Sequence, residues 1–180
     1  IQYPFGRVVS EYKRGVIRLY CRIRGHILRN RLLNEIGQYI PHEGHIAEFG
    51  CGFGIFCLCF ALTRPRAVFY GCDLNTGRIE EAQRVVHALD VQNATLTAEN
   101  ALTFVDKVPD LDCIYMLDIV HHLPPAEVDG FLEKVWRHVK PGGILVIKDI
   151  STRPWHKMAF TWILDVLMTK GEIPNYLAPE

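Results

Sequence analysis

The chain has 180 residues, about the size of one domain, and 49% of them are apolar, which supports a buried core and excludes general disorder. Lys and Arg together number 20, as do Asp and Glu, so bulk charge gives no argument for a nucleic acid partner. The charge is nevertheless uneven. Residues 1–40 hold eight basic against two acidic side chains, whereas residues 41–180 hold twelve against eighteen. A basic front end on an acidic body raises the question of a partner surface.

Six cysteines are spread along the chain without a C-x-x-C pair. Cys57 and Cys59 lie inside an apolar run, which is typical of small buried hydrophobic side chains. We therefore expect a reduced cytoplasmic protein rather than a disulfide framework or a zinc site. No cluster of His, Asp and Glu has the spacing of metal ligands, so no metal is expected.

Residues 6–36 are predicted to be helical, with a break at Gly25. Apolar residues recur at steps of three and four, while Arg14, Arg18 and Arg22 lie on another face. We expect residues 1–40 to form a basic, amphipathic helical extension ahead of the main domain at 41–180.

Beyond residue 44 the pattern alternates between strand and helix. Short apolar runs predict strands at 45–49, 67–72, 94–98, 111–117 and 144–150, and helical stripes lie between most of them at 55–62, 79–89 and 125–139. Asn75 or Thr76 would cap the second of these helices, and Pro125 suits the start of the third. This order predicts a mainly parallel, doubly wound α/β sheet covered on both faces.

A glycine-rich turn, Glu48-Phe49-Gly50-Cys51-Gly52-Phe53-Gly54, stands where the first strand meets the first helix of the sheet. In a doubly wound sheet this is the crevice where ligands bind, and Asp73 follows at the end of the second strand, where an acid can accept both hydroxyls of a ribose. The dinucleotide pattern G-x-G-x-x-G would need Gly at position 55, which is Ile. Alternatively, the glycine-rich turn only connects the strand tightly to the helix and binds no ligand.

The pattern E-x-G-x-G-x-G resembles motif I of the class I S-adenosylmethionine-dependent methyltransferases. Three further segments resemble motifs of that family in the same order: Glu99-Asn100-Ala101, the run from Asp112 to Pro124, and Val139-Lys140-Pro141-Gly142-Gly143. The resemblance implies a Rossmann-like fold and S-adenosylmethionine as cofactor, with S-adenosylhomocysteine as product.

The resemblance also implies roles for individual residues at the cofactor site. The backbone of the turn would approach the methionine part, Glu48 would orient the turn or meet the cofactor's ammonium through water, and Asp73 would hold the ribose. Leu74 would pack on the adenine. The amide oxygen of Asn100 would accept a hydrogen bond from the adenine amino group, as the Asp that the family often has at this position does. The cofactor-binding set is therefore Glu48, Gly50, Cys51, Gly52, Gly54, Asp73, Leu74, Asn100, Ala101 and Leu117.

Three residues after the fourth strand are candidates for catalysis: Asp118, His121 and His122. Histidine suits proton removal near neutral pH. The alternative for both histidines is packing and hydrogen bonding at the start of a helix. Asp118 would orient His121, line the acceptor pocket, or cap the following helix.

The expected function is methyl transfer to a small-molecule or lipid-like acceptor. The alternatives are a noncatalytic cofactor-binding partner subunit, or a methyltransferase for RNA or protein. The Asn/Asp-Pro-Pro-Tyr signature of base methylation is absent after the fourth strand, where Asp118 to His121 stand, so a nucleic acid acceptor is not favoured.

The basic helix at 6–24 and the apolar segment at 155–168 have two interpretations. They cap the cofactor site and pack on each other or on a second subunit, as in a homodimer, or they meet an anionic membrane surface. The family's sheet has seven strands, but we count five, so the sixth and seventh are expected to be missing and domain 41–180 to be C-terminally incomplete.

Overall fold

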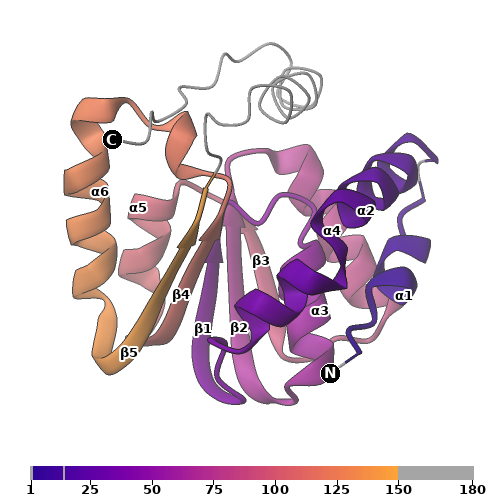
Figure 1. Ribbon diagram of the computed structural model, residues 1–180, viewed down its shortest axis with the longest axis horizontal. Coiled ribbons are helices and arrows are strands. Elements are labelled where there is room, and N and C mark those ends of the chain that lie inside the picture. Colours follow the sequence, from indigo (N-terminus) through magenta and orange to yellow (C-terminus); the bar gives the residue numbers. More distant parts are fainter. Residues whose placement is uncertain (1, 14, 150–180) are drawn as a thin grey trace.

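The computed structural model describes residues 2–13 and 15–149, with the backbone alone described for 24–31. Its centre is a five-stranded sheet in the order β3-β2-β1-β4-β5, and every neighbouring pair is parallel (Figure 1). Because all strands run the same way, their carboxyl ends meet at one edge of the sheet. The strands are β1 (Glu43–Phe49), β2 (Arg66–Asp73), β3 (Ala94–Ala98), β4 (Leu111–Leu117) and β5 (Val139–Lys148).

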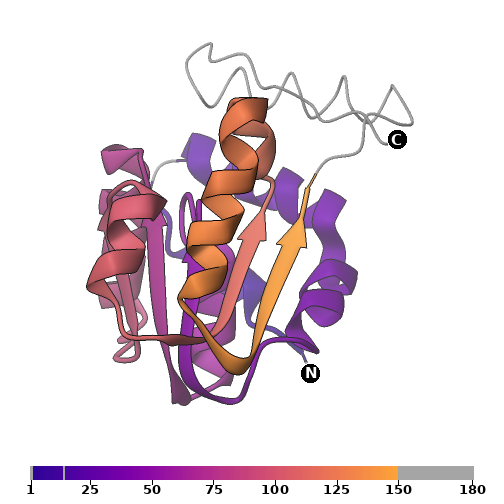
Figure 2. The same cartoon turned by 90° about the vertical axis from the view of Figure 1, so that its left-hand side faces the viewer.

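Helices cover both faces of the sheet (Figure 2). One face carries α1 (Phe5–Ser10), α2 (Gly15–Gly37), α3 (Ile55–Thr63) and α4 (Thr76–Ala88). The other carries α5 (Ala101–Phe104), η1 (Val105–Lys107) and α6 (Pro125–Arg137), and the short turn η2 (Val120–His122) follows β4. The predicted doubly wound, Rossmann-like sheet is therefore confirmed.

Helix α3 shows why its sequence is apolar on all sides. Seven of its nine residues are buried, from Ile55 to Ala61. One side packs on the sheet and the other on α1 and α2. A helix enclosed in this way needs no polar face.

The predicted strands all exist, and the predicted helix starts hold. Asn75 caps α4 by accepting the backbone N–H of Arg78 at 3.0 Å, and Pro125 is the first residue of α6. The start of the fifth strand was placed too late, because β5 already begins at Val139 and contains Pro141 to Gly143, where its pairing with β4 is irregular. Helix α5 and the η1 turn were not predicted.

The prediction of one helix over 6–36 with a break at Gly25 is wrong. The chain leaves the helix after Ser10, and α2 then runs without interruption through Gly25. The break comes where Tyr12 turns inward and donates its hydroxyl to the carbonyl of Phe53 at 2.6 Å. As a result α2 is rotated so that Val16, Leu19 and Ile23 are exposed by 77%, 58% and 37% instead of facing the core.

The N-terminal residues share a core with the sheet. Tyr3, Val9 and Tyr12 are buried in one cluster with Leu33, Ile36 and α3. All six cysteines are buried and free, and the predicted burial of Cys57 and Cys59 is confirmed. The boundary at residue 40 remains a prediction.

The segment 155–168 and the question of further strands lie outside the described residues. Within those residues β5 is the outermost strand on its side of the sheet. No helix in the described part of the chain combines the length and the apolar character needed to cross a bilayer.

Candidate functional site

A pocket opens at the carboxyl ends of β1, β2 and β4, where the strand order reverses between β1 and β4. Such a reversal is the usual ligand site of an open α/β sheet. Most predicted cofactor residues of the glycine turn meet there, together with candidates from the end of β4. The lining residues are Tyr20, Glu48, Gly50, Cys51, Gly52, Phe53, Ile55, Phe56, Asp73, Arg78, Leu117, Asp118, Ile119 and His122.

The glycine turn presents its backbone to this pocket at Gly52. Gly52 has a φ of +55°, and a Cβ added there would meet nothing nearer than Asp73 Oδ2, at 4.0 Å. Gly54 differs, since a Cβ there would lie 2.7 Å from Leu96 Cδ1. Gly54 therefore allows close packing of α3 on its neighbours and is absent from the lining of the pocket.

Asp73 connects the turn to the end of β2. Its Oδ2 accepts the N–H of Gly52 at 2.9 Å, and its Oδ1 accepts the N–H of Asn75 at 2.9 Å. The carboxylate thus fixes the turn and borders the pocket at the same time. Each oxygen keeps a second lone pair in these contacts.

Glu48 and Cys51 line the pocket from buried positions. Glu48 is 3% exposed, and its Oε2 accepts the hydroxyl of Tyr115 at 3.0 Å. Burial, and after it the charge of Glu48, raises the pKa of the Cys51 thiol well above its ordinary value. Cys51 therefore stays a neutral thiol, and its N–H is already donated to the carbonyl of Cys72 at 2.9 Å.

The segment after β4 is tied to the end of β5. Asp118 has a φ of +58°, which is uncommon outside glycine. Its N–H donates to the carbonyl of Lys148 at 2.8 Å, and its carboxylate forms an ion pair with the Lys148 ammonium. Residues held in such conformations cluster at functional sites.

The two adjacent histidines have different surroundings. His121 is 1% exposed, and its Nδ1 lies 2.6 Å from Asp149 Oδ1. The backbone N–H of His121 donates to Asp149 Oδ2 at 3.1 Å. His122 is exposed, lines the pocket, and lies with its ring centroid 4.1 Å from that of His121. Of the roles considered for Asp118, it lines the pocket, and the carboxylate seen on the His121 ring is that of Asp149.

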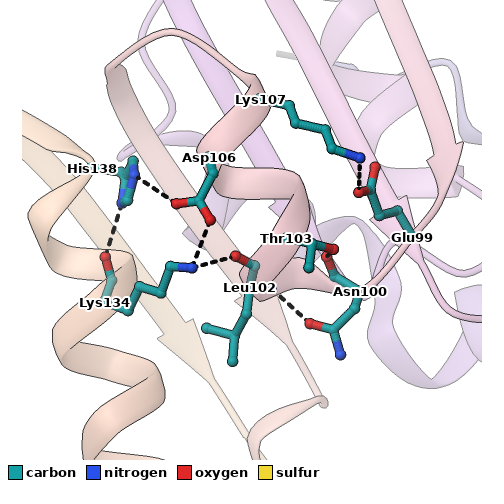
Figure 3. Close-up of polar contacts among 8 residues, drawn as sticks. All are labelled: Glu99, Asn100, Leu102, Thr103, Asp106, Lys107, Lys134 and His138. Carbon is teal, nitrogen blue, oxygen red and sulfur yellow. Dashed lines mark hydrogen bonds and ion pairs between the residues drawn. The ribbon is translucent and has the colours of Figure 1, made fainter.

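Three residues predicted to bind the cofactor, Leu74, Asn100 and Ala101, are absent from the pocket lining. Leu74 is 74% exposed beside Asp73. Asn100 instead caps α5, because its Oδ1 accepts the N–H of Leu102 at 2.8 Å, and Ala101 is the first residue of that helix (Figure 3). Lys134 of α6 holds this helix by donating to the Leu102 carbonyl at 2.6 Å (Figure 3). The adenine roles remain predictions.

Several lining residues were missed by the sequence analysis. Tyr20 of α2 and Arg78 of α4 both approach Phe53 of the turn, the Tyr20 ring at a centroid distance of 5.9 Å and the Arg78 guanidinium at 5.9 Å from the ring centroid. Phe53 lies inside the glycine-rich motif from Glu48 to Gly54, and this position was a usable signal. Tyr20 carried no signal, because its position depends on the break before α2.

The side chains around the pocket suit a ligand that carries positive charge and a ribose. Three carboxylates line it, those of Glu48, Asp73 and Asp118, against Arg78 as the one Lys or Arg of the described lining. Open space at Gly52 lets a ligand touch the backbone. Among the described residues no three His, Cys, Asp or Glu side chains form a group that could hold a metal ion.

A parallel sheet with a glycine turn after β1 and an acid at the end of β2 defines a nucleotide-type cofactor-binding domain of the Rossmann-like class. The sequence profile of the family described as "Methyltransferase domain" matches residues 47–145. The chain belongs to this family, the class I S-adenosylmethionine-dependent methyltransferases, and the cofactor of the family is S-adenosylmethionine.

Two curated relatives share the description "Ubiquinone biosynthesis O-methyltransferase". That of Chelativorans sp. (strain BNC1) is 34% identical over 113 residues, which are 62% of this chain and 42% of the relative. That of Brucella anthropi is 32% identical over 116 residues, or 62% and 43%. The chain thus spans about two fifths of the length of the curated relatives it matches.

Solved structures show the same fold. PKMT2 from Rickettsia typhi in complex with AdoHcy has a TM-score of 0.57 at 21% identity, over 70% of this chain and 25% of that one. The mitomycin 7-O-methyltransferase MmcR has a TM-score of 0.64 at 13% identity, over 97% and 50%. The [4+2]-cyclase SpnF has a TM-score of 0.61 at 19% identity, over 69% and 46%, so the fold alone does not define the reaction.

Proposed function

We propose that this protein transfers the methyl group of S-adenosylmethionine to an oxygen of a small-molecule or lipid-like acceptor. The observation that carries the proposal is the open backbone at Gly52 beside Asp73, in a pocket at the reversal point of the sheet. The descriptions of the curated relatives support oxygen as the atom methylated. Because the chain spans about two fifths of those relatives, the activity of the whole protein is part of the proposal.

In this proposal the glycine turn faces the methionine part of the cofactor through Gly50, Cys51 and Gly52, with Gly54 supporting the turn by packing. Asp73 accepts from the ribose hydroxyls, and Glu48 faces the ammonium. The adenine lies beyond Asp73, toward Leu74, Asn100 and Ala101. Leu117 borders the cofactor at the end of β4.

The bound cofactor supplies a methyl group already activated by its sulfonium. The protein's part is then to align the acceptor, an effect worth about 7–11 kcal/mol in favourable cases. His122 lines the pocket. In its neutral form it takes up the proton that the methylated hydroxyl group loses. His121, whose Nδ1 lies within hydrogen-bond distance of Asp149 Oδ1, packs against the ring of His122. Asp118 lines the same pocket.

Cofactor binding tests the first half of the proposal. Asp73→Ala removes a charged acceptor for the ribose and an anchor of the Gly52 N–H. Calorimetric titration should show S-adenosylmethionine binding weakened by about 1.5–3 kcal/mol. NAD should not compete in the wild type. Tight NAD binding, or unchanged affinity for S-adenosylmethionine in the variant, would show that the assignment of Asp73 to the ribose is wrong.

Methyl transfer tests the second half. The protein is incubated with methyl-labelled S-adenosylmethionine and a cell extract, which is then separated into organic-soluble compounds, water-soluble compounds, RNA and protein. Label is expected in a low-molecular-weight fraction, and His122→Ala should reduce its rate about a hundredfold, while the control His87→Ala retains it. Label in RNA or protein would support that alternative, and binding without any transfer would support a noncatalytic partner subunit.

Helix α2 favours a peripheral membrane location for this enzyme. The exposed Val16, Leu19 and Ile23 stand beside the exposed Arg22, and Tyr20 of the same helix lines the pocket. An anionic bilayer would receive both the apolar and the basic side chains and deliver a lipid-like acceptor to the pocket. A second subunit of a homodimer is the alternative occupant. Six free, buried cysteines favour the cytoplasm as the compartment.

A further inference from the structure

A buried tyrosine stands behind the pocket and has no part in the mechanism above. Tyr115 lies in β4, is fully buried, and packs edge-on against Phe60 of α3 at a centroid distance of 5.7 Å. Its hydroxyl donates to Glu48 Oε2 at 3.0 Å. Burial, and after it the charge of Glu48, raises the pKa of Tyr115 well above its ordinary value, so its proton stays on the phenol to donate.

The sheet sets this contact up through its register. Glu48 of β1 pairs with Tyr115 of β4 across the parallel ladder, so both side chains rise from the same face toward α3. On that face of β4 the flanking residues are Cys113 and Leu117, both in the apolar core. The single phenol of β4 therefore stands directly opposite Glu48 of β1.

A phenylalanine would fill this position for packing alone. A buried carboxylate, however, is costly unless hydrogen-bond donors stabilise its ionised form. Tyr115 supplies such a donor from the core side, and Glu48 lines the pocket on the other side. The hydroxyl thus holds the Glu48 carboxyl group in place where it lines the pocket.

We infer that Tyr115 is a positioning residue that holds the Glu48 carboxylate for the ammonium group of the cofactor's amino-acid part. The inference rests on the proposed function and adds to it a residue to which the sequence analysis assigned no role. It assigns the Glu48–Tyr115 pair to one end of the cofactor only, the end that carries the amino acid. Asp73, in contrast, serves the ribose end.

Two ligands separate those ends. S-Adenosylhomocysteine carries the amino acid, whereas 5′-methylthioadenosine has the same adenosine and thioether without it. Calorimetric titrations of the wild type should show both binding. Tyr115→Phe should weaken S-adenosylhomocysteine about tenfold or more, as expected for one hydrogen bond to a charged group, and leave 5′-methylthioadenosine within twofold.

Glu48→Gln is the second variant, and it keeps an acceptor for Tyr115 while removing the charge. It should also weaken S-adenosylhomocysteine alone, and adding Tyr115→Phe to it should cost less than in the wild type, because the two residues act as one unit. The control Tyr70→Phe loses a hydroxyl that lies 3.1 Å from His45 Nδ1, and both affinities should stay unchanged.

Equal weakening of both ligands in Tyr115→Phe would identify a merely structural role and overturn the inference, as would no weakening at all. If Tyr115→Phe does not fold, selective loss in Glu48→Gln supports the pair, and equal loss overturns it. Failure of the wild type to bind either ligand would instead overturn the proposed function.

Discussion

At the scale of single residues, Gly52 and Gly54 serve two different purposes within one motif. Both have positive φ, +55° and +72°, which side chains other than glycine adopt with strain. The space around them differs, since Gly52 faces the open pocket and Gly54 faces Leu96 and Ala82. Motif spacing alone cannot separate a ligand glycine from a packing glycine.

Substitution should separate the two roles. Gly52→Val is expected to abolish S-adenosylhomocysteine binding in calorimetry while the thermal transition stays cooperative, because the branched side chain occupies ligand space. Gly54→Val should lower the free energy of unfolding by about 1–3 kcal/mol or more, because its Cβ would lie 2.7 Å from Leu96 Cδ1. Normal binding by Gly52→Val would show that the turn is only a connection.

Asp112, at the opposite end of the sheet from the pocket, links pH to stability. Burial opposes ionisation of this carboxyl group. The Lys140 ammonium at 2.9 Å and the backbone N–H of His45 at 2.7 Å outweigh the effect of burial and hold the pKa of Asp112 below the ordinary 3.8. The ionised form is therefore favoured by folding. Its contribution is fully present above about pH 4–5 and is lost as pH falls through the lowered pKa.

Thermal melts between pH 6 and pH 2 check this sign. The wild type should lose more stability on acidification than Asp112→Asn, whose neutral amide makes no ionised contact to lose. Near pH 6 the variant should be the less stable of the two. Parallel acid-induced losses in both proteins would contradict the assignment.

At the scale of elements, Arg64 joins the N-terminal helices to α3. It is 1% exposed and donates to the carbonyl of Gly37 at 2.8 Å, the carbonyl of Ile40 at 3.3 Å and the hydroxyl of Tyr3 at 3.2 Å. Gly37 ends α2, and Arg64 itself directly follows α3. A cation at two helix C-termini is favoured by both helix dipoles.

Replacing Arg64 by Leu should lower the free energy of unfolding by about 3 kcal/mol or more, because buried carbonyl groups lose their donor. Urea unfolding measures this change. Arg66→Leu is the matched control, since Arg66 is exposed and forms an ion pair with the exposed Glu43, and it should change stability by less than about 1 kcal/mol. Similar losses of unfolding free energy in both variants would contradict the role of Arg64 in joining the N-terminal helices to α3.

The exposed face of α2 gives the prediction on membranes. The wild type should sediment with vesicles that contain anionic lipid at low salt and be released at high salt. Replacing both Val16 and Leu19 by Ser should weaken this binding about tenfold, whereas Trp136→Ser, on α6, should leave it unchanged. Absence of binding at low salt would end the membrane proposal, and a concentration-dependent dimer lost in the double variant would identify a second subunit as the occupant.

At the scale of the whole molecule, the sequence predicted what depends on local pattern. Alternating apolar runs located all five strands, and the glycine turn with Asp73 located the pocket, because parallel strands bring their carboxyl ends together whatever the details between them. Resemblance to the family supplied the cofactor. These parts of the fold follow from periodicity and spacing.

What the sequence did not predict depends on contacts between distant residues. The break after Ser10 is fixed by Tyr12 on Phe53, which lies 41 positions along the chain. Asp149 meets His121 across 28 positions, and Tyr115 meets Glu48 across 67. Such pairs are set by sheet register and packing, and no local pattern marks them.

A crystal structure with S-adenosylhomocysteine is the decisive test of whether the pocket at the glycine turn binds the cofactor. We expect the ligand over the backbone at Gly52, with the ribose hydroxyls donating to the Asp73 carboxylate and the ammonium beside Glu48. Ligand density elsewhere, or a ribose without contact to Asp73, would contradict this expectation.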